Sequence, residues 1–199
     1  MQDTDLSTSS PLERLVARAE QLMQRIEAVL PQPLQAPADW GAAIAWRYRK
    51  RANGCGVLEP VRHVGAMQLS DLQNIDAQKE KIARNTEQFV QGRTANNVLL
   101  TGARGTGKSS LIRACLHAYA DQGLRLIEVD KADLTDLPDI VEVVATRPES
   151  FIIYCDDLSF EEGEPGYKAM KSILDGSVSA ATPNVLVYAT SNRRHLLPE

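Results

Sequence analysis

Three glycines, a lysine and a serine lie close together near the middle of the chain, with the spacing of a loop that binds phosphate. Gly102, Gly107, Lys108 and Ser109 fill the pattern G-x-x-x-x-G-K-[ST]. Glycine lets successive N–H groups and the start of a following helix approach an anion closely. Lys108 is expected to reach the β- and γ-phosphates of a nucleotide, and the Ser109 hydroxyl is expected to bind Mg²⁺. The residues predicted to form this nucleotide-binding loop are Gly102, Ala103, Arg104, Gly105, Thr106, Gly107, Lys108, Ser109 and Ser110.

The segments on either side support this interpretation over a glycine-rich turn that matches the pattern by chance. Residues 98–101 form a short apolar run typical of a buried strand. Residues 110–119 have the apolar spacing of a helix. The predicted order of strand, loop and helix is the one that phosphate binding requires.

Two carboxylates supply a second group. Asp156 and Asp157 directly follow the wholly apolar run 151–155. An acid that closes such a strand in a phosphate-loop ATPase holds Mg²⁺, which assigns Asp156. The next acid is the candidate for orienting or deprotonating the attacking water, which assigns Asp157. The alternative is a solvated pair of carboxylates at the start of a loop.

Polar residues also end the last predicted strand, residues 184–190. If this fourth strand lies between the first and the third, Asn192 would sit beside the γ-phosphate and position the lytic water. Arg193 and Arg194 would stabilise charge, in this site or in that of a neighbouring subunit. For both arginines a solvated cap on the strand end is an equal alternative.

The remaining pattern predicts the scaffold. Strands are expected at 98–101, 124–129, 151–155 and 184–190, and helices at 76–91, 110–119, 137–145 and 167–174. Alternation of strands and helices predicts an α/β fold, a three-layer α/β/α arrangement around a parallel sheet. Residues 130–136 and 54–64 are interpreted as surface connections, and residues 41–51 as a short helix that carries Trp46 and Tyr48 among basic residues.

The N-terminal part differs from the rest. A helix of about twenty residues is predicted from Pro11, with one apolar stripe at steps of three and four residues. The stripe is expected to pack on its own domain, and pairing with a partner helix is the alternative. Prolines make residues 31–38 a linker. We therefore divide the chain into residues 1–38, a helix and linker, and residues 39–199, an ATPase core.

Composition limits the kinds of protein that this chain can be. The chain has 199 residues and a formal net charge of −4, which disfavours a protein that is basic overall. The N-terminus lacks the pattern of a signal peptide, and no apolar run is long enough to span a membrane. The three cysteines are scattered and form no C-x-x-C pair, so we expect reduced thiols in a cytoplasmic protein.

With these motifs placed, the chain resembles AAA+ phosphate-loop ATPases. Gly102 to Ser109 is similar to their Walker A loop, the strand ending in Asp156-Asp157 to Walker B, and Ala189 to Arg193 to sensor 1. More narrowly, it resembles a bacterial family of AAA+-like ATP-binding proteins of undefined role, over residues 39–199. That resemblance rests on the segments 96–100, 156–161, 174–177 and 188–195. It implies Mg-ATP as ligand, an adenine pocket near residues 72–76 and a tendency to form rings.

Two departures from the AAA+ pattern bear on activity. Asp157 stands where a glutamate is usual, and its shorter side chain implies slower hydrolysis, although bacterial replication initiators carry the same Asp-Asp pair. The chain also reaches Glu199 without the fifth strand and helical lid of the family. We therefore expect a fragment in which the strand 98–101 lies at a sheet edge.

The sequence predicts Mg-ATP binding and ATP hydrolysis coupled to the remodelling of an unknown protein partner. One alternative is a nucleotide-dependent loader that binds nucleic acid through the basic residues 47–51, and another is an ATP-binding scaffold without hydrolysis.

Overall fold

The structure, a computed structural model, describes residues 10–30, 34–160, 164–174 and 182–192. The chain divides into two compact units, residues 1–33 and 34–199. The first contains helix α1 (Pro11–Val29), which begins with Pro11 in its first turn and a capping box. In that box Glu13 N–H donates to Ser10 Oγ, and Ser10 N–H donates to a Glu13 carboxylate oxygen. The predicted helix is therefore confirmed.

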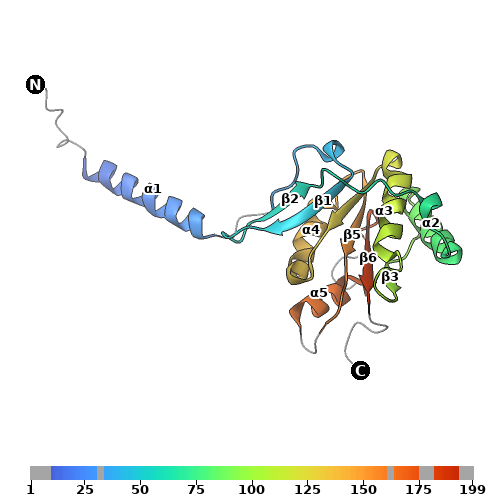
Figure 1. The fold of residues 1–199 in the computed structure, drawn as a ribbon. Coiled ribbons are helices and arrows are strands. Elements are labelled where there is room, and N and C mark those ends of the chain that lie inside the picture. Colours follow the sequence, from blue (N-terminus) through green and yellow to red (C-terminus); the bar gives the residue numbers. More distant parts are fainter. Residues whose placement is uncertain (1–9, 31–33, 161–163, 175–181, 193–199) are drawn as a thin grey trace, which may run out of the picture. The chain divides into compact units, whose positions relative to one another are not determined.

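The second unit is built on one six-stranded sheet with the order β2-β1-β4-β5-β6-β3 (Figure 1). The strands are β1 (Ala45–Lys50), β2 (Gly56–Pro60), β3 (Val98–Thr101), β4 (Leu124–Glu128), β5 (Ser150–Cys155) and β6 (Val185–Ser191). All neighbours pair in parallel except β1 and β2. All four predicted strands are present. The fourth of them, β6, lies between β5 and β3 as the Asn192 hypothesis requires.

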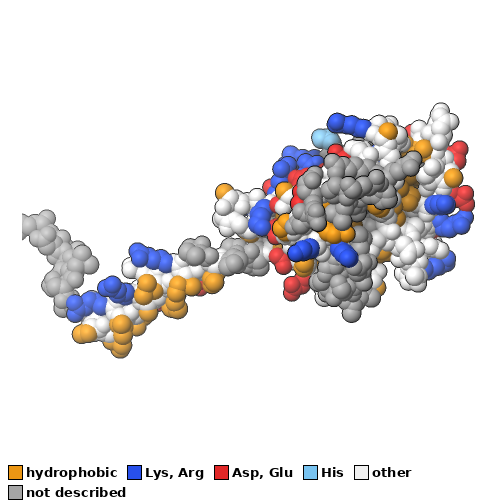
Figure 2. Space-filling view, turned by 90° about the horizontal axis from the view of Figure 1, so that it is seen from below, with side chains coloured by type: hydrophobic (Ala, Val, Ile, Leu, Met, Phe, Trp, Pro, Cys, Tyr) orange, Lys and Arg blue, Asp and Glu red, His pale blue; other side chains and the backbone are white. Residues whose placement is uncertain are grey.

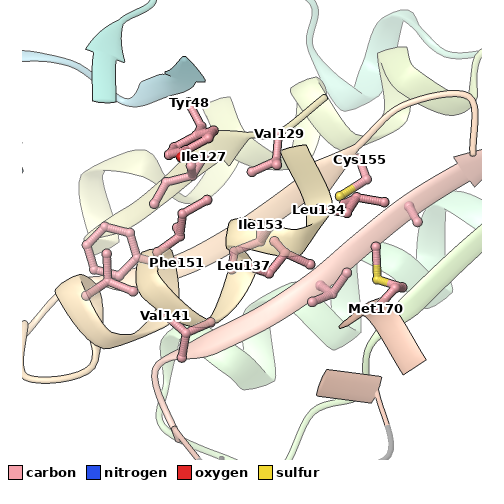
Figure 3. Packing of buried hydrophobic residues seen from close by; sticks show 14 of the residues in the cluster. Tyr48, Ile127, Val129, Leu134, Leu137, Val141, Phe151, Ile153, Cys155 and Met170 are labelled. Atoms are coloured by element: carbon pink, nitrogen blue, oxygen red, sulfur yellow. The ribbon is translucent and has the colours of Figure 1, made fainter. Parts of the chain in front are cut away.

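Helices cover both faces of the sheet, which confirms the three-layer α/β/α fold. Helices α2 (Asp76–Val90) and α3 (Lys108–Tyr119) pack on one face, and α4 (Leu137–Val144) and α5 (Pro165–Leu174) on the other. Strand β5 alternates between the two cores: Ile152 and Tyr154 face α2 and α3, whereas Phe151 and Ile153 join the cluster in Figure 3. Each such fully buried apolar side chain contributes about 1.5–3 kcal/mol.

Two predictions about local structure are wrong. Residues 41–51 do not form a helix: a 3₁₀ turn (Trp40–Ala42) leads into strand β1. Trp46 and Tyr48 are two residues apart and both face the α4 side of the sheet, which is the period of a strand. Residues 54–64 are not a loop, because β2 pairs antiparallel with β1. Gln35, inside the predicted linker, also bridges to β2.

The connection after β4 is a further correction. Residues expected on the surface form a 3₁₀ helix (Lys131–Asp136) in which Leu134 is fully buried against the α4 side of the sheet. Its apolar side chain fills the core beside Leu137 and Met170 (Figure 3).

No helix within the described ranges combines the length and apolar character needed to cross a bilayer. Cys55, Cys115 and Cys155 are all buried and form no disulfide.

Candidate functional site

The glycine-rich loop joins the end of β3 to the start of α3. Gly102, Gly105 and Gly107 all have φ in the left-handed range, with values of 149°, 81° and 83°. A side chain at Gly107 would meet no other atom within 4 Å, so its backbone conformation is the reason for glycine there. Helix α3 begins directly after it, at Lys108. The first residues of this helix, Lys108, Ser109 and Ser110, line the cleft beside the loop, and the N–H groups of a first turn have no partner within their helix.

The side chain of Lys108 contacts the backbone of the glycine-rich loop. Its Nζ donates to the carbonyl oxygens of Gly102 and Ala103 at 2.7 and 2.8 Å, and to Asn192 Oδ1 at 3.0 Å. The ammonium group is thus fixed between the loop and the end of β6, and its present acceptors are all uncharged.

Ser109 and Asp156 meet directly. Ser109 Oγ donates to Asp156 Oδ1 at 2.9 Å, and Thr190 Oγ1 donates to the same carboxylate oxygen. Burial raises the pKa of the Asp156 carboxyl, but the hydrogen bonds from Thr190 and Ser109 outweigh it, so the pKa lies below its usual value. Asp156 is therefore ionised at neutral pH, as a metal ligand must be.

Asp157 is held in an uncommon backbone conformation, with φ at 51°. Its N–H donates to Thr190 Oγ1 at 2.9 Å, and its Oδ1 accepts a hydrogen bond from Asn192 Nδ2. Asn192 therefore links Lys108 to Asp157, one through its amide oxygen and the other through its amide nitrogen.

These groups surround one cleft of about 280 Å³. Most of the predicted site residues line it: Arg104, Gly105, Thr106, Gly107, Lys108, Ser109, Ser110, Asp156, Asp157 and Asn192. Of the others, Gly102 lines a neighbouring cleft and Ala103 contributes its carbonyl oxygen to Lys108. Arg193 and Arg194 lie outside the described residues.

Thr190 is the site residue that sequence reasoning missed. It is buried, lines the cleft and contacts both acids through its hydroxyl. The signal for it is the register of the sheet: Cys155 pairs with Ala189, which places Asp156 level with Thr190. That register cannot be read from either strand alone.

A second cleft of about 210 Å³ shares Thr106, Gly107 and Lys108 with the first and is also lined by Gly102. Its other walls are largely apolar and come from the start of α2, from β3 and from α3: Ile75, Gln78, Leu100, Thr101 and Leu111. A polar cleft thus adjoins a mainly apolar one.

The donor set suits a hard cation with few protein ligands. Within the described ranges, His, Cys, Asp and Glu form no cluster of three or more that could enclose a metal. Ser109 and Asp156 instead offer one hydroxyl and one carboxylate. Mg²⁺ keeps several waters and takes its remaining ligands from one or two protein oxygens and substrate phosphates, so these residues fit it.

The basic cluster of the nucleic-acid hypothesis is partly neutralised. Arg47 pairs with Glu128 and Lys50 with Asp136, both at 2.9 Å. These two cations are therefore paired with acidic side chains of the same unit.

Comparison with known proteins gives one family. The profile described as "Protein of unknown function (DUF815)" matches residues 41–199. The chain belongs to the DUF815 family. This confirms the expected relationship to a family whose role is undefined. No curated protein matches the chain.

Among solved structures, DnaI is 23% identical, with a TM-score of 0.47 over 67% of this chain and 73% of that one. A chain of the E. coli MS115-1 HORMA:CdnC:Trip13 complex is 14% identical, with a TM-score of 0.49 over 65% of this chain and 57% of that one. AMPPCP-bound DnaA from Aquifex aeolicus is 16% identical, with a TM-score of 0.46 over 63% of this chain and 42% of that one.

Proposed function

We propose that this DUF815 chain binds ATP with Mg²⁺ and hydrolyses it in the cleft between the glycine-rich loop and the ends of β5 and β6. The observation that carries the proposal is the contact of Ser109 with Asp156, beside Lys108 and Asn192. A phosphate loop, a metal-binding pair and a water-positioning pair converge there from three separate segments. This convergence supports the Walker A, Walker B and sensor 1 roles that we propose for these segments.

Each residue has a task in binding. Lys108 exchanges carbonyl oxygens for charged phosphate oxygens, which are stronger acceptors for an ammonium group. Ser109 keeps its proton directed at Asp156, so that the lone pairs of its oxygen are free for the metal. Ser109 and Asp156 would hold Mg²⁺, which would neutralise negative charge on the phosphates of ATP. The mainly apolar second cleft is suited to the adenine base.

Asp157 and Asn192 act on water in this proposal. Asn192 orients the Asp157 carboxylate, which accepts a proton from the attacking water or aligns it toward the γ-phosphate. Arg193 would stabilise developing charge, in this site or in a neighbouring subunit. Turnover would be coupled to remodelling of a protein partner, in the manner that the AAA+ resemblance implies.

The first experiment replaces Lys108 by alanine. Loss of a charge-assisted contact of about 1.5–3 kcal/mol weakens ATP binding roughly tenfold to a hundredfold. Binding of ATP with Mg²⁺ is measured by calorimetry, with Lys81→Ala on the exposed side of α2 as the control that removes an equal charge. Unchanged affinity in a folded Lys108→Ala protein would refute the proposed site.

Hydrolysis is tested separately with Asp157→Ala. This variant is expected to bind ATP normally but to release no phosphate, because the group that handles water is absent. Phosphate release is followed over a range of protein concentrations. A specific rate that rises with concentration indicates sites shared between subunits. If the unsubstituted chain binds ATP and shows no turnover at any concentration, the hydrolysis part of the proposal is wrong and the binding part stands.

A further inference from the structure

Helix α1 carries an apolar stripe that no described residue of its own unit covers. Its large apolar side chains are 49–68% exposed: Leu12, Leu15, Val16, Leu22, Met23 and Ile26, followed by Leu30 at 55%. Figure 2 shows these side chains gathered along one side of the helix, with basic side chains at its border. A surface of this kind on a regular helix indicates an interaction site.

The spacing of the stripe is that of a supercoil. Leu12, Ala19 and Ile26 recur every seven residues, and Leu15 and Leu22 lie between them at steps of three and four. These are the a and d positions of a heptad repeat, whose natural partner is another helix. Val16 and Met23 occupy e positions and widen the stripe on one side.

The charges beside the stripe identify the partner. Arg18 and Arg25 occupy g positions along one border, whereas Glu20 and Glu27 occupy b positions along the other. When two copies lie parallel and in register, the arginine border of each faces the glutamate border of the other. In the antiparallel orientation arginines would face arginines and glutamates would face glutamates. The pattern is therefore complementary to itself in one orientation only.

The overall charge of the helix disfavours other occupants. Three arginines and three glutamates lie between residues 11 and 29, so the helix carries no net charge. An anionic lipid surface or a nucleic acid requires a basic polar face. Most of the stability of a helix in a protein comes from packing of its amphipathic face, so pairing would stabilise this helix of 19 residues. We infer that α1 joins two copies of this chain through a parallel coiled coil.

Self-association of the full chain is the first test. Sedimentation measures the dissociation constant of the unsubstituted chain and of the double variant Leu15→Glu with Leu22→Glu, which is expected to be weaker by about a hundredfold or more. Ala17→Glu with Gln24→Glu is the control, because it places the same charges seven residues apart at f positions, away from the stripe. A chain that stays monomeric at all concentrations, as it would if the stripe packed on its own second unit, overturns the inference. So does association that survives the stripe variant.

Charge exchange tests whether the partner is a second copy of α1. The acidic variant Arg18→Glu with Arg25→Glu and the basic variant Glu20→Arg with Glu27→Arg should each associate poorly alone. Their mixture should associate like the unsubstituted chain, because each border then faces its opposite. A mixture no tighter than the separate variants contradicts pairing through these borders.

Disulfide trapping decides the orientation. Leu12→Cys and Ile26→Cys lie at the two ends of the helix, and the native cysteines are buried. In a parallel pair each variant crosslinks with itself under oxidation. Crosslinking that appears only when the two variants are mixed shows an antiparallel pair and overturns the inference. None of these readouts depends on ATP, so the coil and the proposed ATPase site succeed or fail separately.

Discussion

Thr190 connects the two acids of the site through a single hydroxyl. It donates to Asp156 and accepts from the N–H of Asp157, so one side chain fixes both the carboxylate proposed to bind the metal and the left-handed turn that follows it. Its role is to position these groups.

The substitution Thr190→Val keeps the shape of this side chain and removes both hydrogen bonds. We expect the free energy of unfolding to fall by about 1 kcal/mol at neutral pH; the loss is small because Asp156 is exposed to water. We also expect the affinity for Mg²⁺ to fall. Thr190→Ser should restore both properties, because it retains the hydroxyl.

The stability lost in the Thr190→Val variant should depend on pH in a defined direction. The folded pKa of Asp156 is lower than its unfolded value of about 3.9, so its hydrogen bonds stabilise the fold above that pH. This contribution is lost as the pH falls through the folded pKa. The stability difference between the unsubstituted chain and Thr190→Val, measured by denaturant unfolding, should therefore be largest near neutral pH and shrink in acid. A difference that does not vary with pH contradicts the assigned contact.

Candidate site residues that are neighbours in the sequence could be predicted from it. The loop glycines, Lys108 and Ser109 form a continuous motif, and Asp156-Asp157 directly follows an apolar strand. Thr190 was not predictable, because its contact with Asp156 joins residues 34 apart and depends on how β5 and β6 align.

At the scale of elements, the apolar runs predicted β3, β4, β5 and β6 to within one or two residues, whereas β1 was mistaken for a helix. Strand β1 mixes buried aromatic side chains with cations whose partners, Glu128 and Asp136, lie more than 80 residues away. These acidic partners help the sheet to accommodate a strand that carries several cations. A prediction from the sequence of residues 45–50 alone cannot include them.

The hairpin of β1 and β2 depends on Gly56. A Cβ at this buried position would lie 2.6 Å from the Tyr48 hydroxyl and 2.9 Å from a Leu34 methyl. Tyr48 Oη donates to Asp136 at 2.8 Å, so the added methyl would displace an anchored side chain. Gly56→Ala is expected to lower the free energy of unfolding by about 1–3 kcal/mol.

Gly65→Ala is the matched control for this hairpin. Gly65 has no positive φ, and a Cβ there would meet nothing within 4 Å, so little change is expected. Thermal unfolding compares the two variants. Equal changes in melting temperature at both positions would show that the close contacts of Gly56 do not determine the stability of the hairpin.

At the scale of the whole molecule, the two units should be separable. Residues 34–199 hold the complete sheet, both buried clusters and the candidate site. Removal of residues 1–33 is expected to leave the melting temperature and the affinity for ATP unchanged while abolishing self-association. Calorimetry and sedimentation of the shortened chain test this, and a marked fall in melting temperature would show that the units stabilise each other.

The position of β3 in the sheet has a consequence for how the site responds to a ligand. Among the described strands β3 pairs with β6 alone, as expected from the sequence, whereas β5 is paired on both sides. Backbone amides on the unpaired side of β3 are open to isotope exchange with solvent, and those of β5 are protected. The glycine-rich loop therefore follows an edge strand that exchanges faster than β5, the strand that the two acids follow. When a ligand occupies the cleft, deuterium uptake by the backbone amides of β3 should slow, whereas uptake by those of β5 should not change.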